Sequence, residues 1–454
     1  MDVAKINMQK IMAMLAQTGE KPEPLTGITE TLLNIPYIRR DGSMDERPVR
    51  LFAPDSAERP MPLVYVAHYE MPADSLEIRD YLLKGWAVAS AAEFKNDYNS
   101  VLTSDALIFN NAALYTLRNR SEIDKNRIAV VGGSAGGYMS LMLNAMQLGI
   151  CCSVANGPVC NVHFNFYKYF TDANRFNLEA LTALPKEDLK NPMKLLAACP
   201  IPFVGAISAG AGFDKCCDWF VDKTDMANWE CISPTALTEC FCNPLYITQA
   251  TSDILVPIEQ LTREYTYAPG ETLPEGYDAR LGDCPGKLGK ALCERLEPEE
   301  LNLFQVPVIT DGSVTPMAFD PEKRFQVCIT DEGAPQSYAS HNLGIAKGRA
   351  SDVEYIQHHF DRTAAQTNVL TTGKLHLLAQ RYAGQAPQLV SHEGVDDAVY
   401  GSLAVYRKEI LDQLSKWTED NGVAAFREAI QIAVEADAVW MPALREIEQQ
   451  ISAE

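Results

Sequence analysis

The sequence predicts an α/β protein built on a mostly parallel, doubly wound sheet. Short apolar runs that suit buried strands alternate with helical patterns across 62–155. In the stretch 127–140, RIAVVGGSAGGYMS, an apolar run leads through a glycine-packed turn into a helical pattern. The same rhythm returns at 244–265, after a segment dense in aromatic residues. A chain of 454 residues is long enough for one large domain with insertions or for two domains.

The elements follow in chain order from the local patterns. Alternating residues with a central turn at 25–56 predict an antiparallel strand pair. The apolar run PLVYVA at 62–67 suits a buried central strand. Further strands are expected at 86–94, 128–131, 151–157, 244–250 and 325–330, and helices at 75–85, 103–118 and 258–265.

Changes in composition divide the chain. Aromatic residues break the rhythm in one segment, proline, glycine and charge are concentrated in another, and the chain after about residue 345 has almost wholly helical spacing. The expected parts are an N-terminal helix and linker (1–24), the first half of the core (25–157), a cap insertion (158–240), the second half of the core (241–350) with an irregular insertion (268–322), and a long helical C-terminal extension (351–454).

Bulk properties exclude several functions. The formal net charge is −21, so the surface repels nucleic acid and anionic membranes. No run is apolar and long enough to span a bilayer, and no signal peptide is evident, so a cytoplasmic protein is expected. The 12 cysteines lack the paired spacing of a zinc site or disulfide framework, and we interpret them as reduced, mostly buried thiols. No cofactor or metal motif is present, so none is expected.

Ser134 is the candidate nucleophile. It is the centre of a G-x-S-x-G pattern between a buried strand and a helix, where side chains at the flanking positions would clash. Such a turn points the N–H of Ala135 and the helix N-terminus at the space where an oxyanion forms. A plain tight turn is the structural alternative. Ser208, in AISAG, has alanine at the first glycine position and no clean helix behind it, which makes it the weaker candidate.

A serine nucleophile needs a base, and the base needs an acid. His341 follows the last expected strand in a turn rich in small residues, and Asp253 ends an apolar strand, where ligand sites of α/β sheets collect. A helix N-cap role fits Asp253 almost as well on local grounds. The loop after 62–67 should supply the second oxyanion donor, through Tyr69 or Glu70. For the remaining histidines we expect structural roles: loop ordering by 68, core or pocket packing by 163, and surface or packing roles for 358, 359, 376 and 392.

The motifs GGSAGG, TSDILVP and SHN together resemble the α/β-hydrolase superfamily. Within it, DKNRIAVVGGSAGGYMSLML and PLYITQATSDILVP are most similar to the prolyl-oligopeptidase-related esterases and peptidases, over about residues 45–350. The resemblance implies an α/β-hydrolase fold with Ser134 as nucleophile, Asp253 as acid and His341 as base. Two departures are evident: the usual His-Gly-Gly is replaced by His-Tyr-Glu at 68–70, and 88 residues separate Asp253 from His341.

The expected function is a serine hydrolase that acts through an acyl-enzyme. The aromatic cap favours a carboxylic ester of a small substrate, including aromatic substrates. The lack of an N-terminal region of the size of a β-propeller also favours an esterase over an oligopeptidase. Two alternatives are a serine peptidase or amidase on small peptides and a non-catalytic binding or scaffold module. The apolar stripes of the C-terminal helices either pack on the same subunit or form a homo-oligomer, and we favour self-association slightly.

Overall fold

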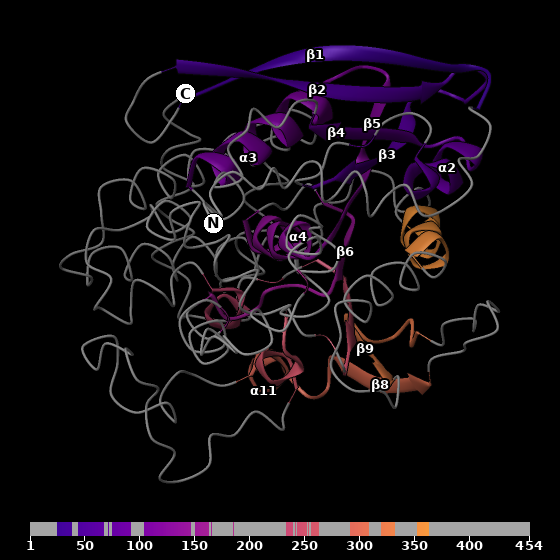
Figure 1. The fold of residues 1–454 in the computed structure, drawn as a ribbon. Coiled ribbons are helices and arrows are strands. Elements are labelled where there is room, and N and C mark those ends of the chain that lie inside the picture. The colour runs from indigo at the N-terminus through magenta and orange to yellow at the C-terminus, as the bar shows by residue number, and fades with distance from the viewer. Residues whose placement is uncertain are drawn as a thin grey trace, which may run out of the picture.

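The computed structural model contains one nine-stranded sheet within its described residues, in the order β1-β2-β4-β3-β5-β6-β7-β9-β8 (Figure 1). The structure describes residues 25–38, 44–67, 71, 75–91, 104–146, 150–162, 165, 185, 233–238, 241, 243–251, 253, 256–262, 291–307, 319–331 and 352–362. The strands are β1 (Ile28–Ile38), β2 (Met44–Pro54), β3 (Met61–Val66), β4 (Ala87–Ala91), β5 (Ile123–Gly133), β6 (Cys152–Asn156), β7 (Leu245–Ala250), β8 (Leu301–Pro307) and β9 (Phe325–Asp331).

The expected antiparallel pair at 25–56 is confirmed. β1 and β2 pair over their whole length, and β2 joins the sheet through an antiparallel pairing with β4. All other neighbours are parallel, and β3 lies between β4 and β5. The strand order therefore changes direction at β3, which is the arrangement of a doubly wound sheet. The carboxyl ends of β5, β6 and β7 consequently lie side by side at one edge.

Helices cover both faces of this sheet, as the alternation of strands and helices predicts (Figure 1). The described helices are α2 (Leu76–Leu83), α3 (Ser104–Arg118), α4 (Ala135–Met146), α11 (Leu292–Arg295) and one at 352–362, with 3-10 turns η5 (Pro234–Ala236) and η7 (Ile258–Gln260). One apolar cluster buries the sheet against α2 and the helix at 352–362, and a second buries the opposite face against α4 and α11. α3 is fixed to the sheet by Tyr65, whose hydroxyl donates to Asn110 Oδ1 at 2.7 Å.

The edge strand β8 is an addition that the sequence pattern does not predict. It lies inside the segment 268–322, which we expected to be irregular, and it pairs in parallel with β9. A strand at an edge is only partly covered, and its side chains here are half-buried or exposed, with Leu303 41% exposed. Its apolar signal is therefore weaker than that of the central strands, which are buried on both faces.

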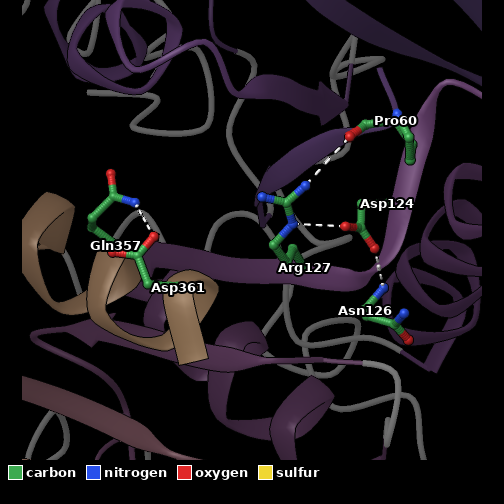
Figure 2. A network of polar contacts seen from close by, with 6 residues as sticks. All are labelled: Pro60, Asp124, Asn126, Arg127, Gln357 and Asp361. Carbon is green, nitrogen blue, oxygen red and sulfur yellow. Dashed lines mark hydrogen bonds and ion pairs between the residues drawn. The ribbon is translucent and has the colours of Figure 1, made fainter. Parts of the chain in front are cut away.

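A polar network fixes the first half of β5, far from its carboxyl end. Figure 2 shows Arg127, whose Nε lies 2.7 Å from Asp124 Oδ2 and whose Nη2 donates to the carbonyl of Pro60 at 3.4 Å. The other oxygen of Asp124 accepts the N–H of Asn126 at 2.9 Å. The β3–β5 register shifts between Met61 and Leu63, so these bonds stabilise an irregular start of the pairing.

Several sequence predictions lie outside the described residues: the N-terminal helix, most of the cap insertion, and the extension beyond residue 362. Among the helices that the structure describes, none has the length and apolarity needed to cross a bilayer. None of the five cysteines that the structure describes forms a disulfide, and four of the five are buried, with Cys151 half-buried; they are Cys151, Cys152, Cys160, Cys293 and Cys328.

Candidate active site

Ser134 lies in a strained turn between β5 and α4. Its φ is +56°, and it is the one non-glycine residue with a positive φ in the part of the chain that the structure describes. This left-handed conformation costs an L-residue about 1–2 kcal/mol, and such strain collects at functional sites. The turn therefore has the geometry of a nucleophile elbow, which lifts a serine above the sheet at a strand's carboxyl end.

The glycines around Ser134 permit a very close approach of strand and helix. A Cβ on Gly132 would lie 2.2 Å from the carbonyl oxygen of Gly136, a distance that no side chain tolerates. A Cβ on Gly137 would lie 3.0 Å from Pro158 Cβ and 3.1 Å from the carbonyl oxygen of Asn156. The first glycine of the G-x-S-x-G pattern is therefore required because its Cα faces the backbone of the last one.

Backbone hydrogen bonds hold Ser134 on both sides. Its N–H donates to the carbonyl of Asn156 on β6 at 2.7 Å, and its carbonyl accepts the N–H of Tyr138 at 3.0 Å. The N–H of Ala135 belongs to the first turn of α4, whose donors have no acceptor within the helix. This donor, at the positive end of the helix dipole and next to the serine, suits an oxyanion.

Asp253 is a buried carboxylate just after the carboxyl end of β7. Its Oδ1 accepts the N–H of Val256 at 2.9 Å, and its Oδ2 accepts Gln249 Nε2 at 3.1 Å. Gln249 Nε2 also donates to the carbonyl of Val256 at 2.8 Å, so the amide and the loop together fix the carboxylate. The N-cap of the following turn η7 is Pro257, so Asp253 does not cap it.

Gln249 is a hydrogen-bond partner of Asp253 that the sequence pattern does not predict. It is buried near the end of β7, in a strand otherwise composed of apolar and hydroxyl-bearing side chains. A buried amide must be hydrogen-bonded, and here its partners include the predicted acid. The available signal was the polar residue in LYITQA, four positions before Asp253.

The other predicted participants fall outside the described residues: His341, Tyr69, Glu70, and the alternatives His68, His163 and Ser208. Strand β9 ends at Asp331, ten residues before His341 in the chain. The structure therefore places Ser134, Ala135 and Asp253 at the carboxyl ends of β5 and β7, and the role of His341 as base stays a prediction. Within the described ranges, no group of three or more His, Cys, Asp or Glu side chains is arranged to hold a metal ion.

His358 and His359 pack against aromatic rings, in line with the surface or packing roles expected for them. Both residues lie on the helix at 352–362. The ring centroid of His358 lies 5.3 Å from that of Phe319, and the ring centroid of His359 lies 4.5 Å from that of Tyr355. Burial, together with the neighbouring His358 and Arg362 charges, lowers the pKa of His359 to about 3. A histidine that stays neutral among aromatic rings is part of the packing of this helix.

A mostly parallel sheet with helices on both faces and a serine in a left-handed turn between strand and helix define an α/β-hydrolase fold with a nucleophile elbow. Residues 93–183, which include this elbow, match the model of the prolyl oligopeptidase family. The match confirms the resemblance stated above for the segment around Ser134.

Solved structures similar to this chain include hydrolases of several kinds. A puromycin hydrolase is 15% identical, with 73% of this chain and 40% of that protein covered and a TM-score of 0.40. An acylaminoacyl peptidase from Pyrococcus horikoshii is 12% identical, with coverages of 75% and 40% and a TM-score of 0.40. An esterase from Pyrococcus furiosus is 13% identical, with coverages of 75% and 97% and a TM-score of 0.40. The chain thus spans two fifths of the first two proteins. No curated protein gives a significant match.

Proposed function

We propose that this chain is a serine hydrolase that cleaves a carboxylic ester of a small substrate through an acyl-enzyme. The observation that carries the proposal is the strained left-handed conformation of Ser134 between β5 and α4. A plain tight turn would place a glycine or asparagine at a positive φ, since a serine there is costly without a function. The family match over residues 93–183 supports the same class of chemistry.

The proposed steps follow the usual logic of a serine nucleophile. His341 removes the proton of the Ser134 hydroxyl as the oxygen attacks the carbonyl carbon, and Asp253 holds the imidazole and balances its charge. The N–H of Ala135 and a donor from Tyr69 or Glu70 stabilise the tetrahedral oxyanion. The protonated histidine then gives its proton to the leaving alcohol. Water, deprotonated by the same histidine, releases the acid and restores the serine.

An ester substrate is favoured by the segment that follows β6. The carbonyl of Asn156, the last residue of β6, contacts Ser134, and the aromatic-rich sequence of 163–170 begins seven residues later. Aromatic side chains near a nucleophile suit a small, apolar acyl or alcohol group. A peptidase or amidase is the second candidate, and the match to the prolyl oligopeptidase family favours it. Both reactions use the same three residues.

Two assays test the proposal. A fluorophosphonate probe should label the full chain on Ser134, and the label should be lost in Ser134→Ala. Labelling that persists in this variant, or no labelling of the wild type, contradicts the serine mechanism. Paired p-nitrophenyl esters and p-nitroanilides with the same acyl groups should show faster turnover of the esters. Equal turnover of the anilides would assign the chain to the amidases.

We also propose a cytoplasmic protein that acts on small molecules and self-associates through the helices expected at 351–454. The described cysteines are thiols outside disulfides, which supports a reducing compartment, and the net charge of −21 disfavours nucleic-acid and anionic membrane partners. The number of subunits per particle, obtained from the mass in solution, should fall when the chain is truncated after about residue 390. An unchanged oligomeric state would contradict the role of these helices.

A further inference from the structure

Three buried polar side chains connect the strands beside Ser134 to the helix at 352–362. They belong to Asn156 on β6, Thr248 on β7 and Asp352 at the start of the helix, and they are 3%, 1% and 1% exposed. Asn156 Oδ1 accepts the Thr248 hydroxyl at 2.6 Å, and Asn156 Nδ2 donates to Asp352 Oδ2 at 3.3 Å. The side-chain amide of Asn156 is therefore held by hydrogen bonds at both its oxygen and its nitrogen.

The backbone of the same residue holds the nucleophile. The carbonyl of Asn156 accepts the N–H of Ser134 at 2.7 Å, and the next residue, Gly157, donates its N–H to the carbonyl of Thr248 at 2.7 Å. Gly157 has a φ of +56°, so the chain turns sharply directly after Asn156. The side-chain bonds of Asn156 thus fix the orientation of the carbonyl that restrains Ser134.

The helix at 352–362 is a rigid support for Asp352. Tyr355 packs on Tyr246 of β7 at 5.3 Å between ring centroids, and Phe360 packs on Trp86 beside β4 at 5.0 Å. The helix is thus fixed to the sheet at two points beyond Asp352. In the chain it begins eleven residues after His341, the predicted base.

We propose that the Asn156–Asp352 pair is a positioning element for the nucleophile. It fixes the Asn156 carbonyl that holds Ser134 in its strained turn, and it joins this turn to the helix that follows the predicted base segment. The inference rests on the proposed hydrolase function. Asn156 and Asp352 are positioning residues, because they act through the backbone of Ser134. The two residues are 196 positions apart in the chain, and the hydrogen bond between their side chains is buried.

A reciprocal exchange of the two side chains tests this pair. Asn156→Asp places two carboxyl groups in contact, and such a pair holds one proton readily but resists losing both. Asp352→Asn removes the charge but keeps a carbonyl oxygen that can accept Asn156 Nδ2, so it is the milder of the two changes. In the double variant N156D/D352N, the carboxylate accepts from Thr248 and from the new amide, so both side-chain hydrogen bonds of position 156 can form again.

The assay measures kcat and KM for ester hydrolysis from pH 5 to 9. The concentration of active sites is determined by titration with fluorophosphonate, so that kcat is expressed per active site. Asn156→Asp should lower kcat on the order of 10- to 100-fold at pH 8 with little change in KM. Asp352→Asn, which keeps an acceptor for Asn156 Nδ2, should lower kcat less. The loss in Asn156→Asp should shrink at low pH, where a shared proton restores the bond, and grow as the pair ionises at higher pH. The double variant should recover at least half of the wild-type kcat at every pH.

Asn144→Asp is the matched control. Asn144 is a buried asparagine near the end of α4 that donates to Ser153 Oγ at 3.0 Å and to the carbonyl of Asn243 at 3.3 Å. The Asn144→Asp substitution should lower the free energy of unfolding while leaving kcat per titrated site unchanged.

Each outcome either supports or overturns the pair. Wild-type protein that neither hydrolyses esters nor takes the probe contradicts the proposed function itself. If the wild type is active, Asn156→Asp with unaltered kcat per titrated site overturns the positioning role, even where its stability falls. If the single variants do not fold, the exchange decides: a folded double variant with wild-type kcat supports the pair, and one that fails to fold or that has impaired kcat refutes it.

Discussion

Gly132→Ala tests how closely strand and helix must meet beneath Ser134. The added Cβ would lie 2.2 Å from the carbonyl oxygen of Gly136 and 2.4 Å from its carbonyl carbon. Non-bonded atoms of this kind are stable at about 3.5 Å, so the two backbones must separate by about 1 Å. Overpacking on this scale costs about 1–3 kcal/mol or more, and a 1 Å displacement of a reacting group lowers kcat on the order of 100-fold.

The assay compares ester turnover, fluorophosphonate labelling and urea unfolding. Gly137→Ala is the milder comparison, because its Cβ would meet Pro158 Cβ at 3.0 Å and the carbonyl oxygen of Asn156 at 3.1 Å, contacts that need an adjustment of only a few tenths of an ångström. We expect Gly137→Ala to lose far less activity and stability than Gly132→Ala. Wild-type kcat and an unchanged free energy of unfolding in Gly132→Ala would refute the close approach as described.

Three further variants test the site and its surroundings. Ser134→Gly should be more stable than Ser134→Ala by about 1 kcal/mol in urea unfolding, because glycine accepts a positive φ without strain; equal stability would contradict the strained elbow. Gln249→Met should lower the free energy of unfolding by about 1–3 kcal/mol, since Asp253 loses a buried donor, and should also lower kcat. If both quantities stay at their wild-type values, Gln249 does not position Asp253. His359 has a folded pKa of about 3, below its ordinary value of 6.5, so its contribution to stability is complete above pH 6.5 and is lost as the pH falls towards 3. His359→Phe should flatten this decline between pH 7 and 4, and an identical pH slope in both proteins would exclude His359 as its source.

Local patterns predict the central part of the fold because each of its elements is buried in a way that the sequence records. The run from Arg127 to Ser140 combines an apolar strand, small residues and helical spacing, so both the elbow and its serine are evident. The helix at 352–362, which contains His358 and His359, also follows from spacing alone.

Contacts between distant residues leave no comparable local pattern. The bond between Asn156 and Asp352 joins positions 196 apart, and neither residue has a neighbour in the chain that indicates the other. Gln249 looks like an ordinary polar residue until the loop after β7 brings Asp253 and Val256 to its amide. The edge strand β8 is half-exposed, so its composition does not distinguish it from the surrounding irregular chain.

The buried thiols affect how the protein responds to covalent reagents. Electrophiles react with a thiolate, and burial raises the pKa of Cys152 and Cys160 well above the ordinary value and that of Cys328 to about 11. At neutral pH these three sulfurs are protonated and covered by the helices on either face of the sheet. An acylating inhibitor therefore meets little competition from them, and of the described cysteines only Cys151 lies closer to the surface. Selective modification of Ser134 should consequently be attainable in the native protein without blocking these thiols first.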